Sequence, residues 1–226
     1  MRAPISVVIP VLNAGNALPS CAASLIEGVE AGLIRELIAS DGGSIDETQR
    51  IADDIGAVWV SGAASRGGQL LRGCMAAQGD WLLILHADTQ LKAGWSDVAA
   101  AHLDRADAGY FKLQFATGGM PAMIVAGWAN IRSRLFGLPY GDQGLLISRD
   151  LYDAVGGYRD IPLMEDVAMA RALKGRLVGL DARAVTSADK YVRGGWLTRG
   201  SRNLWTLIRY FAGVPVEKLA AAYRKP

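Results

Sequence analysis

The fold of this chain is decided by a short apolar stretch near its beginning, Ile5-Ser-Val-Val-Ile-Pro-Val-Leu-Asn13. The run from Ile5 to Val11 is rich in β-branched residues and lacks polar alternation, which is typical of a strand buried on both faces of a parallel sheet. Apolar residues at helical spacing follow between Leu18 and Val29. A buried strand followed by an amphipathic helix is the repeating unit of α/β folds, so we predict that class.

The same alternation of strands and helices continues along the rest of the chain. Ser44 and Glu47 have the spacing of a capping box, which predicts that a helix begins there. Periodicity predicts further strands at 37–40, 57–61, 81–85, 108–116, 144–148 and 177–187. It predicts further helices at 66–78, 95–103, 122–135, 163–173 and 196–212.

Composition and length set the class of protein. Apolar residues make up 51% and charged residues 20% of the 226 residues, which excludes a disordered or fibrous chain. No repeat and no linker-like segment is visible, so we expect one domain over 1–226. Within it, we expect two halves, 1–105 and 106–226, of which the second ends in helices.

Two features of the sequence predict a cytoplasmic protein. No stretch reaches the roughly 18 consecutive apolar residues that a membrane span needs, and Met1 to Ser6 lacks the pattern of a signal peptide. Cys21 and Cys74 both fall within helical patterns, and we expect them to be buried, reduced thiols.

Charge is distributed unevenly, although the net charge is only +2. Residues 1–170 hold 12 Lys and Arg against 19 Asp and Glu, a net −7, whereas residues 171–226 hold 12 against 3, a net +9. The segment 196–212 adds an apolar side to this basic region. It is expected either to pack its apolar side on the core or to lie in the interface of an anionic membrane.

Polar residues follow three of the predicted strands at their carboxyl ends. Asn13, Asp41 and Asp88 each come directly after an apolar run. Ligands of open parallel sheets bind outside the carboxyl ends of the strands, so these three side chains are expected to converge on one site. Asp88 could hold a divalent cation that prefers oxygen ligands, with His86 as a second ligand, or it could cap the following turn.

Three other stretches have the composition of a functional site. Glu165-Asp166 follows Ile161-Pro162, and its carboxylates either stabilise a helix start or supply a general base. Arg66-Gly-Gly-Gln69 has a basic residue and two glycines at a helix start, which suits a phosphate or a flexible loop. Tyr140-Gly-Asp-Gln-Gly144 places three polar side chains between glycines, as loops that line sites often do.

Taken in order, these motifs resemble glycosyltransferase family 2, the nucleotide-sugar-dependent transferases of GT-A fold, and a short single-domain bacterial subgroup in particular. The resemblance covers residues 4–223, and it implies that 1–105 form a nucleotide-sugar-binding half and 106–226 an acceptor-binding half with helices at its end. It rests on the motifs Val7-Val-Ile-Pro-Val-Leu-Asn13, Ser40-Asp-Gly-Gly-Ser-Ile-Asp46, Arg66-Gly-Gly-Gln69, His86-Ala-Asp-Thr89, Tyr140-Gly-Asp-Gln-Gly144, Ile161-Pro-Leu-Met-Glu-Asp166 and Gly213-Val-Pro-Val-Glu-Lys-Leu219.

The resemblance implies a metal-assisted, inverting transfer of one sugar from a nucleotide-diphosphate sugar to an acceptor hydroxyl. Asp166 matches the catalytic base, with Glu165 as the alternative. Asp88 matches the last carboxylate of the family's Asp-x-Asp metal motif, and His86 replaces the first. Residues implied to bind the donor are Pro10, Asn13, Asp41, Gly43, Arg66, Gln69, His86 and Asp88. Residues placed on the acceptor side are Tyr140, Asp142 and Gln143.

The expected partners are a uridine-type sugar donor, Mn²⁺ or Mg²⁺, and an acceptor whose identity the sequence leaves open. A lipid-linked acceptor would bring the enzyme to the inner face of the membrane as a peripheral protein, and no nucleic acid partner is expected. His86 in place of an acid leaves open a non-catalytic nucleotide-sugar-binding relative. The loop after the first strand lacks the basic residues of a nucleotidyltransferase, and no Gly-x-Gly-x-x-Gly follows a strand, which disfavours an oxidoreductase.

Overall fold

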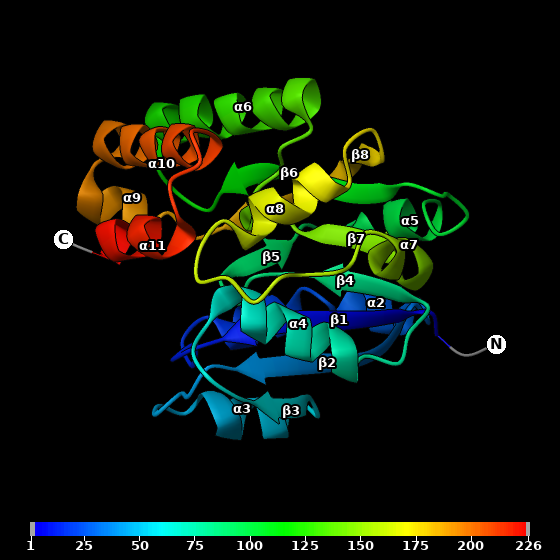
Figure 1. Cartoon of the computed structure of the whole chain (residues 1–226). Helices are drawn as coiled ribbons and strands as arrows, with labels where there is room; N and C mark the ends of the chain where they lie inside the picture. The colour runs from blue at the N-terminus through cyan, green and yellow to red at the C-terminus, as the bar shows by residue number, and fades with distance from the viewer. Residues whose placement is uncertain (1–2, 225–226) are drawn as a thin grey trace.

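A single twisted sheet runs through the whole molecule, with helices on both faces (Figure 1). The computed structural model describes residues 3–224, and within them the sheet has eight strands in the order β3-β2-β1-β4-β7-β6-β8-β5. The strands are β1 (Ile5–Val11), β2 (Ile34–Asp41), β3 (Val58–Ser61), β4 (Trp81–Ile84), β5 (Thr89–Leu91), β6 (Ala108–Phe115), β7 (Leu145–Ser148) and β8 (Leu177–Thr186).

The sheet is mostly parallel, as the sequence predicted. β3, β2, β1 and β4 are parallel neighbours, and β6 is parallel to β8, whereas β7 and β5 pair in antiparallel fashion. The helices are α1 (Leu18–Ala23), α2 (Ile26–Glu30), α3 (Thr48–Asp54), α4 (Arg66–Ala76), α5 (Trp95–Ala100), α6 (Gly119–Phe136), α7 (Arg149–Ala154), α8 (Glu165–Ala172), α9 (Asp189–Gly194), α10 (Trp196–Phe211) and α11 (Val216–Arg224).

Strand β1 is buried on both faces, which explains its unbroken apolar run. Val7 and Ile9 pack with the cluster under α1 and α5, whereas Val8 packs on the opposite side with Leu70 and Cys74 of α4. Strands β1 and β2 end at the same level of the sheet, where Val11 is paired with Asp41. This arrangement fixes the edge of the sheet at which a ligand can bind.

The predicted elements are present with small shifts at their ends, but two local predictions are wrong. Apolar residues 18–29 form two short helices, α1 and α2, instead of one. The capping box at Ser44 is not formed, because the Ser44 hydroxyl donates to Asp41 Oδ1 at 2.6 Å and accepts from the Asn13 amide at 2.8 Å. Helix α3 therefore begins at Thr48. The short elements β5, α7, α9 and α11 were not predicted.

Helix α10 turns most of its apolar side outward, which differs from the core-packing alternative. Its apolar residue Leu197 is 88% exposed, and Leu204, Ile208 and Phe211 are each about half exposed, whereas only Leu207 of this set is buried. The side of α10 that faces the protein carries polar residues instead, including the buried Thr206. Trp196, Leu207 and Tyr210 pack on clusters of the core, but most of the apolar residues of α10 remain exposed.

The start of α4 is packed tightly against a distant segment of the chain. The Gly67 amide donates to the Ile161 carbonyl at 3.1 Å, and a Cβ on Gly67 would lie 2.1 Å from the Arg159 carbonyl oxygen. Ser65 caps the helix by accepting from the Gly68 amide. Residues 66–69 are therefore the first turn of a helix that holds the 159–161 segment in place, and the flexible-loop alternative is wrong.

This contact predicts opposite effects for two glycine-to-alanine substitutions in helices. Gly67→Ala should destabilise the protein by about 1–3 kcal/mol, because the new methyl group overlaps a backbone carbonyl. Gly127→Ala is the control: a Cβ there meets nothing within 4 Å, so the change should raise stability by up to about 1 kcal/mol. Urea unfolding of both variants checks this, and equal stabilities would contradict the packing described.

Candidate functional site

The loop after β2 is organised by the Asp41 carboxylate. Asp41 is buried and accepts from the Gly43 amide at 2.7 Å, from the Ser44 amide at 3.0 Å and from the Ser44 hydroxyl. Asn13, in the left-handed region at φ +50°, accepts from the Ile45 amide through its Oδ1 at 2.9 Å. These contacts join the ends of β1 and β2 and bring Asn13, Asp41 and Gly43 together, whereas Asp88 belongs to a separate group with His86 and Asp142.

Gln69 has a structural role in joining the same two strands. Its buried amide donates to the Val11 carbonyl at 2.7 Å and to the Ser40 carbonyl at 3.1 Å. Both hydrogens of the Gln69 side-chain amide are used in these bonds within the protein. We therefore assign this residue to positioning of the two strand ends instead of to binding of the sugar donor. Pro10 lies nearby on β1, two residues beyond the last pairing of β1 with β4 at Val8.

A second group of polar side chains lies where β4 ends. His86 is buried, and its Nδ1 lies 2.9 Å from Oδ1 of Asp142. Asp88 joins them: one ligand atom from each of His86, Asp88 and Asp142 lies within 4.8 Å of the others. One imidazole and two carboxylates at this separation can hold a divalent cation, and Asp142 is a member that the sequence assigned only to the acceptor side.

Helix α8 begins with the Glu165-Asp166 pair, directly after a strained residue. Met164 has φ +67°, which is rare for a side chain of its size, and it turns the chain so that both carboxylates face the same cavity. Asp166 accepts from the Gly141 amide at 2.9 Å and from the Val167 amide at 2.7 Å. Glu165 is only 1% exposed, its Oε1 lies 3.6 Å from Nε of Arg66, and its Oε2 has no hydrogen-bond partner.

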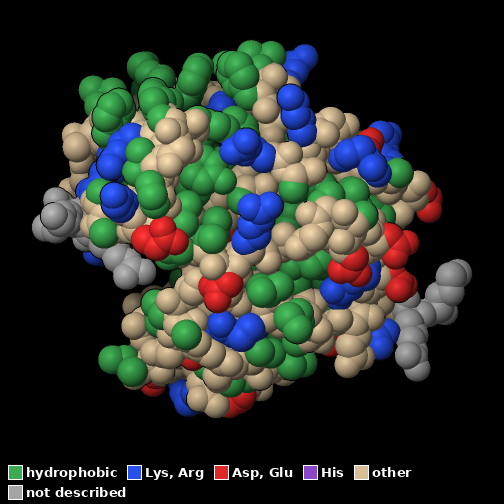
Figure 2. Space-filling view, in the orientation of Figure 1, with side chains coloured by type: hydrophobic (Ala, Val, Ile, Leu, Met, Phe, Trp, Pro, Cys, Tyr) green, Lys and Arg blue, Asp and Glu red, His purple; other side chains and the backbone are tan. Residues whose placement is uncertain are grey.

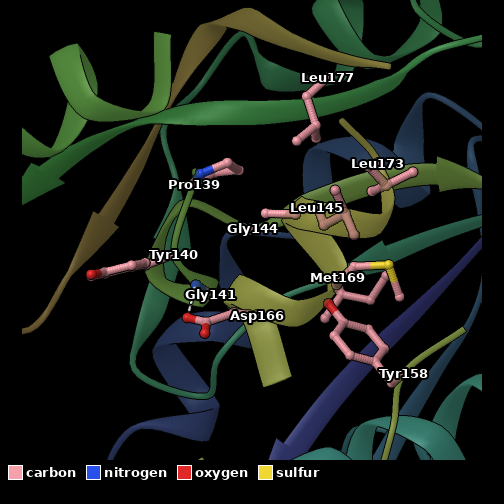
Figure 3. A pocket seen from close by; sticks show the side chains of 12 residues that line it. Pro139, Tyr140, Gly141, Gly144, Leu145, Tyr158, Asp166, Met169, Leu173 and Leu177 are labelled. Carbon is pink, nitrogen blue, oxygen red and sulfur yellow. Dashed lines mark hydrogen bonds between the residues drawn. The ribbon is translucent and has the colours of Figure 1, made fainter. Parts of the chain in front are cut away.

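His86, Asp142, Glu165 and Asp166 meet at a cavity of about 80 Å³. The cavity is lined by residues from both halves of the chain, which are Arg66, His86, Tyr140, Asp142, Leu163, Met164, Glu165, Asp166, Asn203, Thr206 and Tyr223. Asp166 also borders a smaller cavity of about 20 Å³ beneath the 139–145 loop, where Leu145, Met169 and Leu173 give an apolar lining (Figure 3). Asp166 therefore lies between a polar and an apolar space.

The 140–144 loop supports the cavity from the side of β7. Tyr140 stacks under the buried Arg132 guanidinium, whose carbon lies 3.4 Å from the ring centre, and burial raises the pKa of the Tyr140 hydroxyl to about 12. Gln143 is fully buried, accepts from the Ser133 hydroxyl at 2.6 Å and donates to the Phe111 carbonyl. We therefore reassign Gln143 from acceptor contact to positioning of the loop.

Four residues of this site were not predicted from the sequence. Asn203 and Thr206 reach the cavity from the inner side of α10, Tyr223 reaches it from α11, and Arg132 comes from α6. The polar side of the 196–212 helix was the only available signal. On that polar side, Arg199 and Arg202 bond to Tyr223 and to the end of α11.

Comparison with known proteins identifies the family of this fold and site. The sequence profile described as glycosyl transferase family 2 matches residues 6–122, which is just over half of the chain. The chain belongs to glycosyl transferase family 2. The profile covers Asn13, Asp41, His86 and Asp88 and ends before the Glu165-Asp166 pair. No curated protein matches the chain in sequence.

Solved structures of this family share the fold at low sequence identity. TarS of S. aureus in complex with UDP-GlcNAc superimposes with a TM-score of 0.62 at 17% identity, over 81% of this chain and 58% of that one. Glucosyl-3-phosphoglycerate synthase of Mycobacterium tuberculosis, with Mn²⁺ and UDP-glucose, gives a TM-score of 0.60 at 21% identity, over 94% and 80%. The chain spans less than two thirds of the TarS chains that it matches.

The burial of Glu165 predicts how the stability of this protein depends on pH. Burial and the neighbouring Asp166 raise the pKa of Glu165 above its ordinary value of 4.5, so the folded state holds the proton more tightly than the unfolded state. The contribution of protonated Glu165 to the free energy of unfolding is therefore lost as pH rises from 4.5 through the raised pKa. Glu165→Gln should gain stability relative to the wild type over that range.

Urea unfolding of both proteins between about pH 4 and pH 8 measures this difference. Arg66 loses its partner in the variant, but its side chain is 45% exposed and remains solvated. If the difference in unfolding free energy between Glu165→Gln and the wild type does not change with pH, Glu165 titrates as an exposed carboxyl group does, which contradicts the prediction.

Proposed function

We propose that this protein is an inverting glycosyltransferase that moves one sugar from a nucleotide-diphosphate sugar to an acceptor hydroxyl. The observation that carries the proposal is the meeting of two sets of carboxylates at one cavity. Asp142 and His86 line the cavity beside the end of β4, with Asp88 close to both, and Glu165-Asp166 line it from the start of α8. Membership of glycosyl transferase family 2 supports the same reaction.

The donor is assigned to the carboxyl ends of β1, β2 and β4. The Asn13 and Asp41 loop would enclose the base and ribose, and the His86 to Asp88 segment would face the diphosphate. A uridine nucleotide is supported by TarS and by glucosyl-3-phosphoglycerate synthase, which share the fold and were solved with UDP-GlcNAc and UDP-glucose. Arg66, at the first turn of α4 and beside the cavity, adds positive charge toward a phosphate.

The side chains at the end of β4 fit a divalent cation such as Mn²⁺ or Mg²⁺. Two carboxylates offer the oxygen ligands that these ions prefer, and the imidazole of His86 is a ligand for Mn²⁺ more than for Mg²⁺. When bound, the ion neutralises charge on the departing nucleoside diphosphate. Mn²⁺ also accompanies the sugar donor in the structure of glucosyl-3-phosphoglycerate synthase.

Asp166 is the better placed of the two carboxylates to act as the base. Its side chain is half-buried and reachable from the cavity, and the Gly141 amide fixes its orientation. Glu165 is almost fully buried and pairs with Arg66, which suits a positioning role. Asp166 would take the proton of the acceptor hydroxyl as that oxygen attacks the anomeric carbon from the side opposite the nucleotide, which inverts its configuration.

Other features of the chain define the reaction further. The Gln-x-x-Arg-Trp signature of processive polysaccharide synthases is absent from the sequence, which supports a single transfer. Among residues 3–224 no helix is long and apolar enough to cross a membrane. Cys21 and Cys74 are buried free thiols, which supports a reducing compartment such as the cytoplasm. A hydroxyl of a soluble or lipid-linked molecule is proposed as the acceptor.

Asp88→Asn tests the metal site, with Asp80→Asn as its matched control. Both residues flank β4, but Asp80 precedes the strand and lies at the opposite edge of the sheet. Asp88→Asn should lose Mn²⁺-dependent binding of UDP-glucose in calorimetry while keeping the native circular dichroism spectrum. Asp80→Asn should bind as the wild type does. Unchanged Mn²⁺-dependent binding in Asp88→Asn would remove this carboxylate from the metal site.

Asp166→Asn tests the base, with Asp150→Asn as its control. Asp150 is an exposed carboxylate in the first turn of α7, so it shares only the helix-start role. Asp166→Asn should slow release of UDP from the sugar nucleotide by about 10²–10⁴-fold with donor affinity within a few fold of the wild type. Equal rates in the two variants would return Asp166 to a helix-start role, and no release of UDP by the wild type would favour a non-catalytic relative.

A further inference from the structure

Helix α6 exposes large apolar side chains and buries small or polar ones. Seven of its apolar residues are about half exposed or more, among them Met123, Ile124 and Trp128. Its buried side consists mainly of alanines, with Arg132 and Ser133. A helix that covers a core presents the opposite pattern, because burial of large apolar side chains is what holds it in place.

Helix α10 has the same inverted arrangement and contacts α6. Five of its apolar residues are about half exposed or more, and its inner side carries Arg199, Arg202 and Asn203, which bond to α9 and α11. The twelve outward residues of the two helices form what we call the α6/α10 face. They are Met120, Met123, Ile124, Trp128, Ile131, Leu135, Phe136, Leu197, Leu204, Trp205, Ile208 and Phe211.

The α6/α10 face concentrates the exposed apolar surface of the molecule. Within residues 3–224, these twelve account for more than half of the twenty large apolar side chains that are exposed. Figure 2 shows apolar side chains gathered over α6 and α10 along the upper edge of the molecule. Contiguous apolar surface of this kind is rare on monomeric soluble proteins and marks an interaction site.

Charge around the face identifies what covers it. Residues 117–141 and 190–216, which contain both helices, hold seven Lys and Arg and no Asp or Glu. Of these, Arg132 is buried and Arg199 and Arg202 bond to α11, whereas Arg134 and Arg193 are exposed and Arg209 is partly exposed. Two copies of such a face would bring like charges together, which opposes self-association. An apolar face with tryptophans and a basic, acid-free surround matches the surface of an anionic membrane instead. Trp128 and Trp205 are of the residue type that membrane interfaces favour.

We propose that the α6/α10 face lies on an anionic lipid bilayer, with both helices parallel to the membrane plane. None of the helices in the described part of the chain can span a bilayer, so this contact is peripheral. Asn203 and Thr206, on the inner side of α10, line the cavity that holds Asp166. Docking therefore places the proposed active site one helix away from the lipid, and this last step rests on the proposed function.

Flotation with lipid vesicles tests the docking without any need for activity. The full chain should float with vesicles of phosphatidylcholine that contain about 30% phosphatidylglycerol at low salt, float less at about 0.5 M salt and stay at the bottom with pure phosphatidylcholine. Met123→Glu and Leu197→Glu should each lower the apparent partition coefficient about tenfold or more, because a buried apolar contact becomes a repelled charge.

Met75→Glu is the matched control. Met75 is 75% exposed on α4, close to the 73% of Met123 on α6, and it lies outside the face. Met75→Glu should float as the wild type does. All three variants should retain the wild-type thermal shift with UDP-glucose and Mn²⁺, because that shift depends on the fold and the donor site and not on lipid binding.

Three results would overturn the proposal. One is a wild-type protein that remains at the bottom with anionic vesicles at low salt. Another is equal flotation of Met123→Glu, Leu197→Glu and Met75→Glu. The third is a wild-type dimer in sedimentation velocity that becomes monomeric in Met123→Glu while no form floats, which would assign the face to a second copy of the chain.

Discussion

The site depends on the 140–143 loop, which is hydrogen-bonded to two distant parts of the chain. The Gly141 amide donates to Asp166 of α8, and the next residue, Asp142, contacts His86 at the end of β4. Gln143 fixes the loop from below through Ser133 and the Phe111 carbonyl. One short loop thereby sets the position of the proposed base relative to the proposed metal ligands, which is the positioning task that a transfer reaction requires.

The same region holds features that cost stability. Met164 adopts a left-handed backbone conformation that is unfavourable for a side chain of its size, and Glu165 places a nearly fully buried carboxylate with an unpartnered oxygen beside the cavity. Neither feature helps the protein to fold. Strained backbone and poorly satisfied polar groups cluster at functional sites, so their coincidence at the start of α8 supports a functional role for the Glu165-Asp166 pair.

The sequence predicted the sheet well because local pattern determines it. The apolar run Ile5–Val11 has few alternatives to a buried strand, and the polar residues at strand ends follow from parallel topology. The hydrogen-bond partners of individual side chains were harder to predict. Ser44 bonds to Asp41 instead of capping α3, and Gln69 joins two strand ends, because partners distant in sequence decide both.

The orientation of α6 and α10 lay beyond sequence reasoning for a different reason. Periodicity shows that a helix has an apolar side, but it does not show whether that side meets the core or the outside. In α10 the inner contacts are made by Asn203, Thr206 and the arginines that bond to α11, and the apolar side is left outward. The result is a helix that lines the cavity with one side and the α6/α10 face with the other.

The central claim is that the carboxyl ends of β1, β2 and β4, together with the cavity lined by His86 and Asp166, bind a nucleotide-diphosphate sugar with a divalent ion. Thermal unfolding with UDP-glucose, in the presence of Mn²⁺ or of EDTA, tests it most directly. At about 100 times the dissociation constant, binding adds about 2.7 kcal/mol of stability, which corresponds to a rise of several degrees in Tm. The account predicts this rise with Mn²⁺ and its loss with EDTA. No rise with UDP-glucose or any other nucleotide-diphosphate sugar in the presence of Mn²⁺ would contradict it.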